Sequence, residues 1–229
     1  MEVPVLLLEI EGVIVETAEA RRDALVESLA VEGIASSEAM LEAAAGHGTE
    51  DAVRRARRVA GAPDDETAVE LARLRAERAF AARAGKGLPL TRDARTSLER
   101  LAAHVRMALV TRASRREVEF LLGLAGMDGL FRPIIACEDV QPAKPAREPW
   151  IAALTRIGLL FPGQQLKALA VEDHVVGLRA ARAARIASVG VGPIPPFEAI
   201  EGDAWVESLA DLTPDRVRAL TGVSAERQR

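Results

Sequence analysis

Residues 5–17 read V-L-L-L-E-I-E-G-V-I-V-E-T, and this stretch decides the fold. Its apolar run, which begins at Val3 and ends at Leu8, is too short for a helix and predicts a buried strand. Glu9 and Glu11 then stand at the carboxyl end of that strand, where ligands bind in an open α/β sheet. Two interpretations have equal weight at this point: a ligand site built on carboxylates, and a polar strand end that leads into a loop.

A second strand is predicted to end beside a hydroxyl group. Residues 106–114 read R-M-A-L-V-T-R-A-S, so a strand over 106–110 is followed directly by Thr111. Ser114 and Glu117 have the spacing of a capping box, which predicts that a helix begins there. Thr111 is therefore placed on a strand-to-helix loop. Its hydroxyl could bind a ligand or satisfy a local backbone group.

Two further segments carry charged residues. Residues 138–150 read E-D-V-Q-P-A-K-P-A-R-E-P-W, with Lys144 in a proline-rich loop between two α/β units. Residues 166–186 read L-K-A-L-A-V-E-D-H-V-V-G-L-R-A-A-R-A-A-R-I, so a strand delivers Glu172 and Asp173 to its tip. Adjacent acids at a strand end suit Mg²⁺, a hard cation that prefers oxygen ligands.

In order and content, the four segments resemble the motifs of the haloacid dehalogenase (HAD) superfamily. E-I-E-G-V-I-V-E-T is similar to D-x-D-G-[TV]-[LI]-x-D-[ST] with every aspartate lengthened by one methylene. Lys144-Pro145 fits the K-P-x-P segment, although Arg147 replaces its second proline. The fourth segment is similar to V-E-D-S-x-x-G-I-x-A-A-x-A-A-G-M, with His174 in place of serine. The pattern is closest to the phosphoglucomutase- and phosphoglycolate-phosphatase-like branch, whose members carry a C1-type helical cap.

The resemblance implies an α/β fold with a Rossmann-like core, in which helices flank a parallel sheet, and an inserted α-helical cap. Residues 18–86 carry apolar residues at three- and four-residue spacing without a strand signal, which predicts the cap. Strand and helix signals alternate after residue 87, which predicts that the core spans 1–17 and 87–229. The predicted strands are 3–8, 106–110, 133–137, 166–171, 187–191 and 204–207, and the predicted helices are 18–31, 37–45, 49–60, 65–84, 91–103, 114–125, 147–157, 176–184 and 213–220.

The resemblance also implies the roles of individual residues. In the superfamily the first carboxylate attacks a phosphoryl group, and the second protonates the leaving alcohol and then activates water. The catalytic residues implied here are Glu9, Glu11, Thr111 and Lys144, of which Thr111 and Lys144 contact the phosphate. The implied Mg²⁺ ligands are Glu9, Glu172 and Asp173 with the backbone carbonyl of Glu11.

Substrate contacts are expected from the core and from the cap. Gly12 and Arg112 stand next to the implied catalytic residues, and His47 lies in a loop where cap residues of related enzymes enter the active site. Residues 54–58 read R-R-A-R-R and predict a solvated basic face on a helix. The alternative is that one of these arginines reaches a substrate carboxylate or a second phosphate.

The glutamates of the first motif bear directly on activity. One methylene moves each carboxylate by roughly 1 Å, and a misplacement of that size can cost about 10²-fold in rate. Every replacement nevertheless keeps a carboxylate, and Thr111, Lys144, Glu172 and Asp173 are all present. Drift after loss of function would also have produced alanine, asparagine or serine.

Three functions therefore stay open. The favoured one is a Mg²⁺-dependent phosphatase-type hydrolase of a small phosphorylated metabolite, slow or atypical because of its Glu-x-Glu motif. The second is a pseudoenzyme that binds Mg²⁺ and a phosphate ligand and serves a protein partner. The third is a structural subunit, which the presence of Lys144 and the acidic pair makes less favourable. Dehalogenation is disfavoured by the acidic second motif position, and mutase activity stays open.

Whole-chain properties limit the partners. A length of 229 residues gives room for one good core and a smaller accessory domain. The net charge of −4 argues against nucleic-acid binding, and no apolar run approaches the length of a membrane span. Cys137 is the only cysteine, which excludes an intramolecular disulfide and fits a reducing cytosol, so we expect a cytoplasmic protein.

Overall fold

The chain divides into two compact units. The computed structural model describes residues 2–193 and 201–223. Met1–Val15 and Leu90–Arg229 form the first, called here the sheet unit, and Glu16–Pro89 form the second, the helical unit. The sequence predicted a core of residues 1–17 and 87–229 and a cap of residues 18–86.

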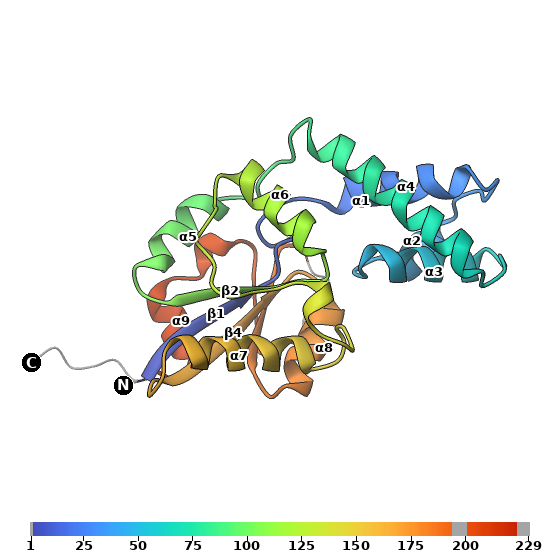
Figure 1. Ribbon diagram of the computed structural model, residues 1–229. Helices are drawn as coiled ribbons and strands as arrows, with labels where there is room; N and C mark the ends of the chain where they lie inside the picture. The colour runs from blue at the N-terminus through green and yellow to red at the C-terminus, as the bar shows by residue number, and fades with distance from the viewer. Residues whose placement is uncertain (1, 194–200, 224–229) are drawn as a thin grey trace, which may run out of the picture. The chain divides into compact units, whose positions relative to one another are not determined.

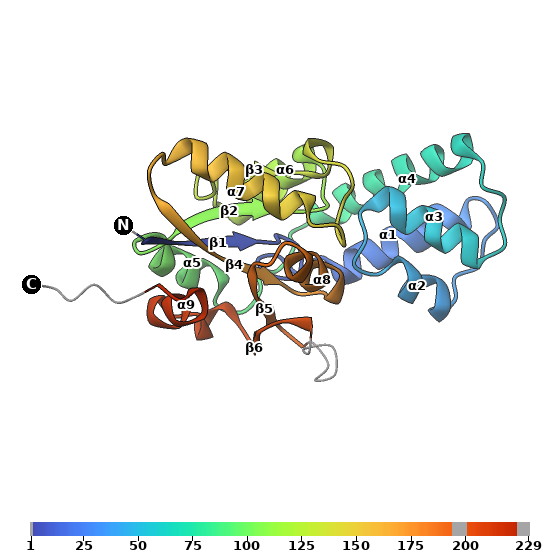
Figure 2. The same ribbon diagram turned by 90° about the horizontal axis from the view of Figure 1, so that it is seen from below.

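A six-stranded sheet, parallel at every pairing, runs through the sheet unit in the order β3-β2-β1-β4-β5-β6 (Figures 1 and 2). The strands are β1 (Glu2–Leu8), β2 (Arg106–Val110), β3 (Ile134–Ile135), β4 (Gln165–Glu172), β5 (Ala187–Val191) and β6 (Ala204–Val206). β1 lies between β2 and β4, with Leu8 in register with Leu109 on one side and Val171 on the other. Val5 to Leu8 are fully buried because helices cover both faces of a parallel sheet. The predicted α/β class is confirmed.

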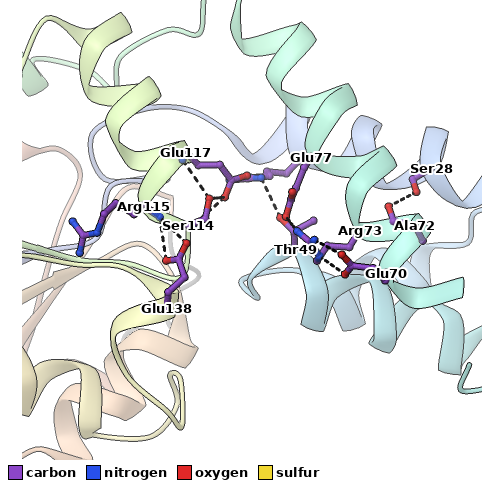
Figure 3. Close-up of polar contacts among 11 residues, drawn as sticks. Ser28, Thr49, Glu70, Ala72, Arg73, Glu77, Ser114, Arg115, Glu117 and Glu138 are labelled. Atoms are coloured by element: carbon purple, nitrogen blue, oxygen red, sulfur yellow. Dashed lines mark hydrogen bonds and ion pairs between the residues drawn. The ribbon is translucent and has the colours of Figure 1, made fainter. Parts of the chain in front are cut away.

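Helices lie on both faces of this sheet. Figure 1 shows α5 (Ala94–Ala102) and α6 (Arg115–Ala125) on one face, and α7 (Glu148–Leu160) and α8 (Val175–Ala183) on the other. α9 (Pro214–Thr221) packs on β4 and β1. α6 begins with the predicted capping box, in which Ser114 and Glu117 each satisfy the other's backbone N–H (Figure 3). This cap fixes the point where the chain leaves β2, directly after Thr111.

Three predicted elements differ from the structure by more than one residue at one end. β3 has two residues instead of five, because Pro133 has no N–H to donate and Cys137–Asp139 form a short 3₁₀ helix, η1. α5 begins at Ala94 instead of residue 91, because Thr91 bonds through its backbone N–H to the Ile14 carbonyl and through its hydroxyl to the Val13 carbonyl. α7 continues to Leu160, past the predicted end at 157.

The helical unit contains α1 (Ala18–Ala30), α2 (Glu38–Ala44), α3 (Thr49–Val59) and α4 (Glu66–Ala84). α1 lies along α4, α2 packs on α3, and α3 also contacts α4 (Figure 1). Leu29, Met40, Val53 and Val69, one from each helix, share a buried cluster. Polar contacts add to this packing: the Ser28 hydroxyl donates to the Ala72 carbonyl at 2.6 Å (Figure 3). None of the helices within 2–193 and 201–223 has the length and apolar character that a membrane span requires.

Candidate active site

Four polar residues meet at the carboxyl edge of the central strands. Glu9 follows β1, Thr111 follows β2, Glu172 is the last residue of β4, and Asp173 comes next. β1 is hydrogen-bonded to both β2 and β4, so the three strand ends are neighbours. Ligands bind at this edge in open α/β sheets. The sequence motifs are thus brought together within the sheet unit.

Lys144 joins two of these residues in a buried ion cluster. Its Nζ donates to Glu9 Oε2 at 3.0 Å and also to Glu172 Oε1. The third contact is with the Val110 carbonyl oxygen at 2.6 Å. The side chains of Lys144 and Glu172 have no exposed surface, and that of Glu9 is 3% exposed. We call Lys144, Glu9 and Glu172 the Lys144 cluster.

The Lys144 ammonium is saturated in this arrangement. An ammonium has three N–H donors and no acceptor. Lys144 has three acceptors within hydrogen-bonding range, two carboxylates and one carbonyl. A further acceptor, such as a phosphate oxygen, can be bound only if one of these contacts is released.

The Glu172 carboxyl group lies in a tightly enclosed place. A Cβ at Gly177, in the first turn of α8, would overlap the Glu172 carboxylate, so glycine is required for this approach. Glu172 Oε2 is buried and has no hydrogen-bond partner in the part of the chain that the structure describes. Burial raises the pKa of the Glu172 carboxyl, Lys144 opposes this, and Glu9 adds to it. When both carboxyl groups are ionised, the cluster has more buried negative charge than one lysine balances.

Gly12 brings the backbone against Asp173. Residues 10–15 form a closed turn in which the Gly12 N–H donates to the Val15 carbonyl at 2.8 Å and the Ile14 N–H to the Ile10 carbonyl at 3.0 Å. Gly12 has φ +71°, and a Cβ there would overlap the Asp173 carboxylate. Burial raises the pKa of Asp173 well above its usual range, and the charges of Glu172 and Glu9 act in the same direction.

The two motif glutamates differ in their surroundings. Glu9 is buried, and its Oε1 accepts the N–H of its neighbour Ile10 at 2.9 Å. Its carboxylate is therefore held by a backbone amide on one side and by Lys144 on the other. Glu11 is half-buried in the turn, where its backbone forms an isolated β-bridge with that of Val15.

Thr111 and Arg112 follow β2 at the same edge. Thr111 is buried, and its hydroxyl oxygen accepts the Ala113 N–H at 3.1 Å, which is the local backbone contact anticipated as the alternative to ligand binding. That hydroxyl also carries a donor. The positive charge of Arg112 acts to lower the pKa of both Glu172 and Asp173. Among the described residues, Arg112 Nη1 is buried and has no hydrogen-bond partner.

The other candidates belong to the helical unit. His47 lies in the loop between α2 and α3, and its Nδ1 is 2.8 Å from the Ala45 carbonyl oxygen. In the segment 54–58, Arg55 and Arg58 are exposed, as a solvated face requires. Arg57 is instead buried and paired with Glu32. Contact of His47 with a substrate stays a prediction.

The acidic residues of the site have the charge that a divalent cation requires, but their side chains do not converge on one point as a set of ligands. In the described ranges no three His, Cys, Asp or Glu side chains converge as a ligand set, and the Lys144 ammonium lies between Glu9 and Glu172. The partnerless Glu172 oxygen, and the burial that raises the pKa values of Glu172 and Asp173, nevertheless indicate acids that lack sufficient positive charge beside them. His174 is not part of this set and caps α8 by accepting the Val176 N–H at 3.3 Å.

The sequence did not single out Trp150, Gly177 or the Val110 carbonyl. Trp150 is fully buried, and its ring centroid is 4.4 Å from Lys144 Nζ, which makes a cation–π contact. The tryptophan follows the lysine by six residues, so an aromatic residue at the start of the next helix was the available signal. Gly177 stands five residues after Glu172 inside a helix, where glycine is unfavourable unless close packing requires it.

Comparison with known proteins agrees with this geometry. The family model of the haloacid dehalogenase-like hydrolases matches residues 5–185. Protein CbbY of Rhodobacter capsulatus is 26% identical over 96% of this chain and 97% of its own length. The phosphoglycolate phosphatase of Pectobacterium atrosepticum is 29% identical over 91% of this chain and 90% of its own.

Solved structures show the same fold. β-Phosphoglucomutase from Clostridium difficile superposes with a TM-score of 0.81 at 17% identity, covering 96% of this chain and 97% of that one. CbbY from Rhodobacter sphaeroides, solved with phosphate, gives a TM-score of 0.77 at 22% identity over 90% of this chain and 95% of that one. The family model spans most of the chain, its motifs meet at one sheet edge, and the chain belongs to the haloacid dehalogenase-like hydrolases.

Proposed function

We propose that this hydrolase is a Mg²⁺-dependent phosphatase that acts on a small phosphorylated metabolite. The observation that carries the proposal is a pair of unsatisfied buried atoms in one site. Glu172 Oε2 is an acceptor and Arg112 Nη1 is a donor, and within the described residues neither has a hydrogen-bond partner. Burying such groups unpaired is costly, so the pair calls for a ligand with both positive and negative parts. A cation together with a phosphate ester has that composition.

The chemistry assigned to the chain's residues has two steps. A Glu9 carboxylate oxygen attacks phosphorus, the ester P–O bond breaks, and Glu11 gives its proton to the leaving alkoxide. Glu11 then takes a proton from water as that water attacks the acyl-phosphate. Inorganic phosphate leaves, and the Glu9 carboxylate is restored. Thr111, Arg112 and the backbone at Gly12 orient the phosphoryl group.

Glu172, Asp173 and Glu9 are the residues that would hold Mg²⁺. The bound ion would supply positive charge that screens the phosphate from the carboxylates. Glu9 is well placed for its own role because one Oε1 contact with the Ile10 N–H fixes its carboxylate beside the strand end. An ionised carboxylate has about four lone-pair sites, so two hydrogen bonds leave capacity for attack.

The relatives support the choice of substrates to test. The curated relative from Pectobacterium atrosepticum is a phosphoglycolate phosphatase, and a CbbY variant from Rhodobacter sphaeroides was solved with xylulose-(1,5)bisphosphate. The panel for this chain therefore starts with phosphoglycolate, sugar monophosphates and sugar bisphosphates. Mutase activity is tested in the same panel as phosphosugar isomerisation without phosphate release.

Phosphate release from this panel, with Mg²⁺ and with excess chelator, is the deciding measurement. Turnover should disappear with chelator and in Glu9→Ala, and should persist in Glu99→Ala, a control that removes an exposed carboxylate on α5. Glu9→Asp combined with Glu11→Asp should raise kcat by up to about 10²-fold, because it restores the shorter reach. If the wild type shows no turnover, a folded double variant that also shows none would refute the hydrolase.

A binding protein is the second candidate, and the saturated lysine favours it. All three Lys144 donors are engaged with protein acceptors, and each Glu9 oxygen accepts one hydrogen bond, as in a site that holds its resting state firmly. This function predicts Mg²⁺-dependent binding of phosphate esters by calorimetry with no turnover across the panel.

A further inference from the structure

We propose that Lys144 is an exchangeable counter-ion of Glu172, so that its ammonium can bind a phosphate oxygen only after Glu172 has taken a divalent cation in its place. Lys144 would thus act as a latch that makes cation binding and oxyanion binding depend on each other. The proposal rests on the proposed function above and deepens it by giving an order of binding at the same site.

The first step is the count of donors. All three N–H groups of Lys144 point to protein acceptors: Glu9 Oε2, the Val110 carbonyl and Glu172 Oε1. Lys144 is buried and has no exposed side-chain surface, so water cannot take over a released contact cheaply. An oxyanion that enters the site therefore competes with a carboxylate for the same donor.

The second step is to identify which of the three Lys144 hydrogen bonds is released. The Val110 carbonyl is a backbone group at the end of β2, where Val110 pairs with Ile135 of β3. Glu9 is tied to the Ile10 N–H through its second oxygen. Glu172 is the one of the three whose other oxygen has no partner in the described chain, so it gains most from a new cation.

Trp150 supplies a place for the released ammonium. Lys144 Nζ lies 4.4 Å from the centroid of the buried Trp150 ring, and a cation over an indole face is attracted by it. The ring therefore retains the lysine at the site when Glu172 is lost as a partner. Trp150 is also a fluorophore in contact with the group that moves. Trp205 is the only other tryptophan, and Trp205→Phe leaves Trp150 as the sole reporter.

Simple charge attraction is the competing explanation. Neutralising Glu172 would strengthen phosphate binding in any site, with or without a lysine. A latch makes a sharper claim, because the gain should pass through Lys144. A double-mutant cycle between the two positions, measured in chelator, separates these explanations without any metal present.

The cycle compares Trp205→Phe protein with the added changes Glu172→Gln, Lys144→Met, and both, using inorganic phosphate as the titrant in calorimetry. We expect Glu172→Gln to tighten phosphate binding at least tenfold when Lys144 is present and less than threefold in the K144M background; couplings of this kind are typically about 5- to 150-fold. Equal tightening in both backgrounds would overturn the latch. Near-UV circular dichroism checks folding, and Lys144→Gln replaces a Lys144→Met protein that fails to fold.

The second measurement needs no change at position 144. In the Trp205→Phe protein, Mg²⁺ alone should shift Trp150 emission, and inorganic phosphate should bind at least tenfold more tightly with saturating Mg²⁺ than in chelator. Phosphate affinity that is the same with and without Mg²⁺ would exclude the latch. Both measurements read binding, so a protein without turnover can still show the latch, and an active phosphatase can still lack it.

Discussion

Two ion clusters in this protein have opposite charge balances. In the helical unit, Glu32 lies between the guanidiniums of Arg57 and Arg75. In the sheet unit, Lys144 lies between the carboxylates of Glu9 and Glu172. The first arrangement, called the Glu32 cluster, has one positive charge in excess, and the second has one negative charge in excess.

The two clusters also differ in how far their side chains are exposed to water. Arg75 and Glu32 have side chains that are 30% and 20% exposed, so solvent shares the excess charge of the Glu32 cluster. Arg57 gains a further contact with the Pro63 carbonyl at 3.0 Å. The side chains of the Lys144 cluster are at most 3% exposed, and solvent cannot share their charge. An excess that water shares is compatible with a purely structural role, whereas an enclosed excess calls for a ligand.

Lys144→Met should have the largest effect on stability. It leaves two buried carboxylates without a cation, and breaking a buried ion pair in this way costs about 3–5 kcal/mol. Urea denaturation in chelator should show a loss at the upper end of that range. Mg²⁺ should then restore part of it, about 2.7 kcal/mol at 100-fold excess over Kd. A variant that loses stability and gains none from Mg²⁺ would mean that the enclosed charge is not a cation site.

Glu32→Gln should cost somewhat less, about 3 kcal/mol, because it removes the carboxylate from two guanidiniums of which one is part-exposed. Mg²⁺ should restore nothing, since the excess charge left behind is positive. Urea denaturation with and without Mg²⁺ measures both claims. Glu42→Gln, at an exposed glutamate on α2, is the matched control and should change stability by less than about 0.5 kcal/mol. An Mg²⁺ effect on Glu32→Gln larger than on the wild type would erase the distinction between the clusters.

The pH dependence of stability gives a smaller but directional test. Asp173 has a folded-state pKa well above its unfolded value, so the folded chain retains a proton that the unfolded chain releases. Stability from this group is therefore present at low pH and is lost as pH rises from about 4 toward the folded pKa, by about 1.4 kcal/mol per proton and pH unit. In chelator, Asp173→Asn should be more stable than the wild type at pH 7, with the difference shrinking toward pH 4. A difference that grows toward acid would reverse the sign assigned to this carboxyl.

The strand ends of the site could be predicted from the sequence because each is a local pattern. An apolar run followed by Glu9, by Thr111 or by the pair Glu172 and Asp173 is visible within ten residues, and the parallel sheet then places these ends side by side. Neither ion cluster has a local pattern. Lys144 and Glu9 are separated by 135 positions, and Arg57 and Glu32 by 25.

The partner of each side chain is likewise not visible in a local sequence pattern. The resemblance assigned Lys144 to the nucleophile and the phosphate; in the structure its three donors meet Glu9, Glu172 and the Val110 carbonyl, and contact with a phosphate stays a prediction. A close approach to a glycine is equally hard to predict from sequence. Gly177 permits the approach of Glu172, and only the packed structure shows which side chain a Cβ at Gly177 would displace. In the segment 54–58, helical periodicity gave the outward face correctly for Arg55 and Arg58 but could not reveal the partner that buries Arg57.

Arg54→Ala should have the smallest effect, although Arg54 has more ionic partners than Arg57. It contacts Glu50 at 3.1 Å, Asp64 at 3.4 Å and Glu66 at 2.5 Å, and its hydrogen bond holds the pKa of Glu66 below its usual value. These three carboxylates are 56–79% exposed, so water and salt screen the contacts. Urea denaturation should show a loss below about 1 kcal/mol that shrinks further in high salt. A loss as large as that of Glu32→Gln would mean that the number of ionic partners, and not their enclosure, decides what an ion cluster contributes.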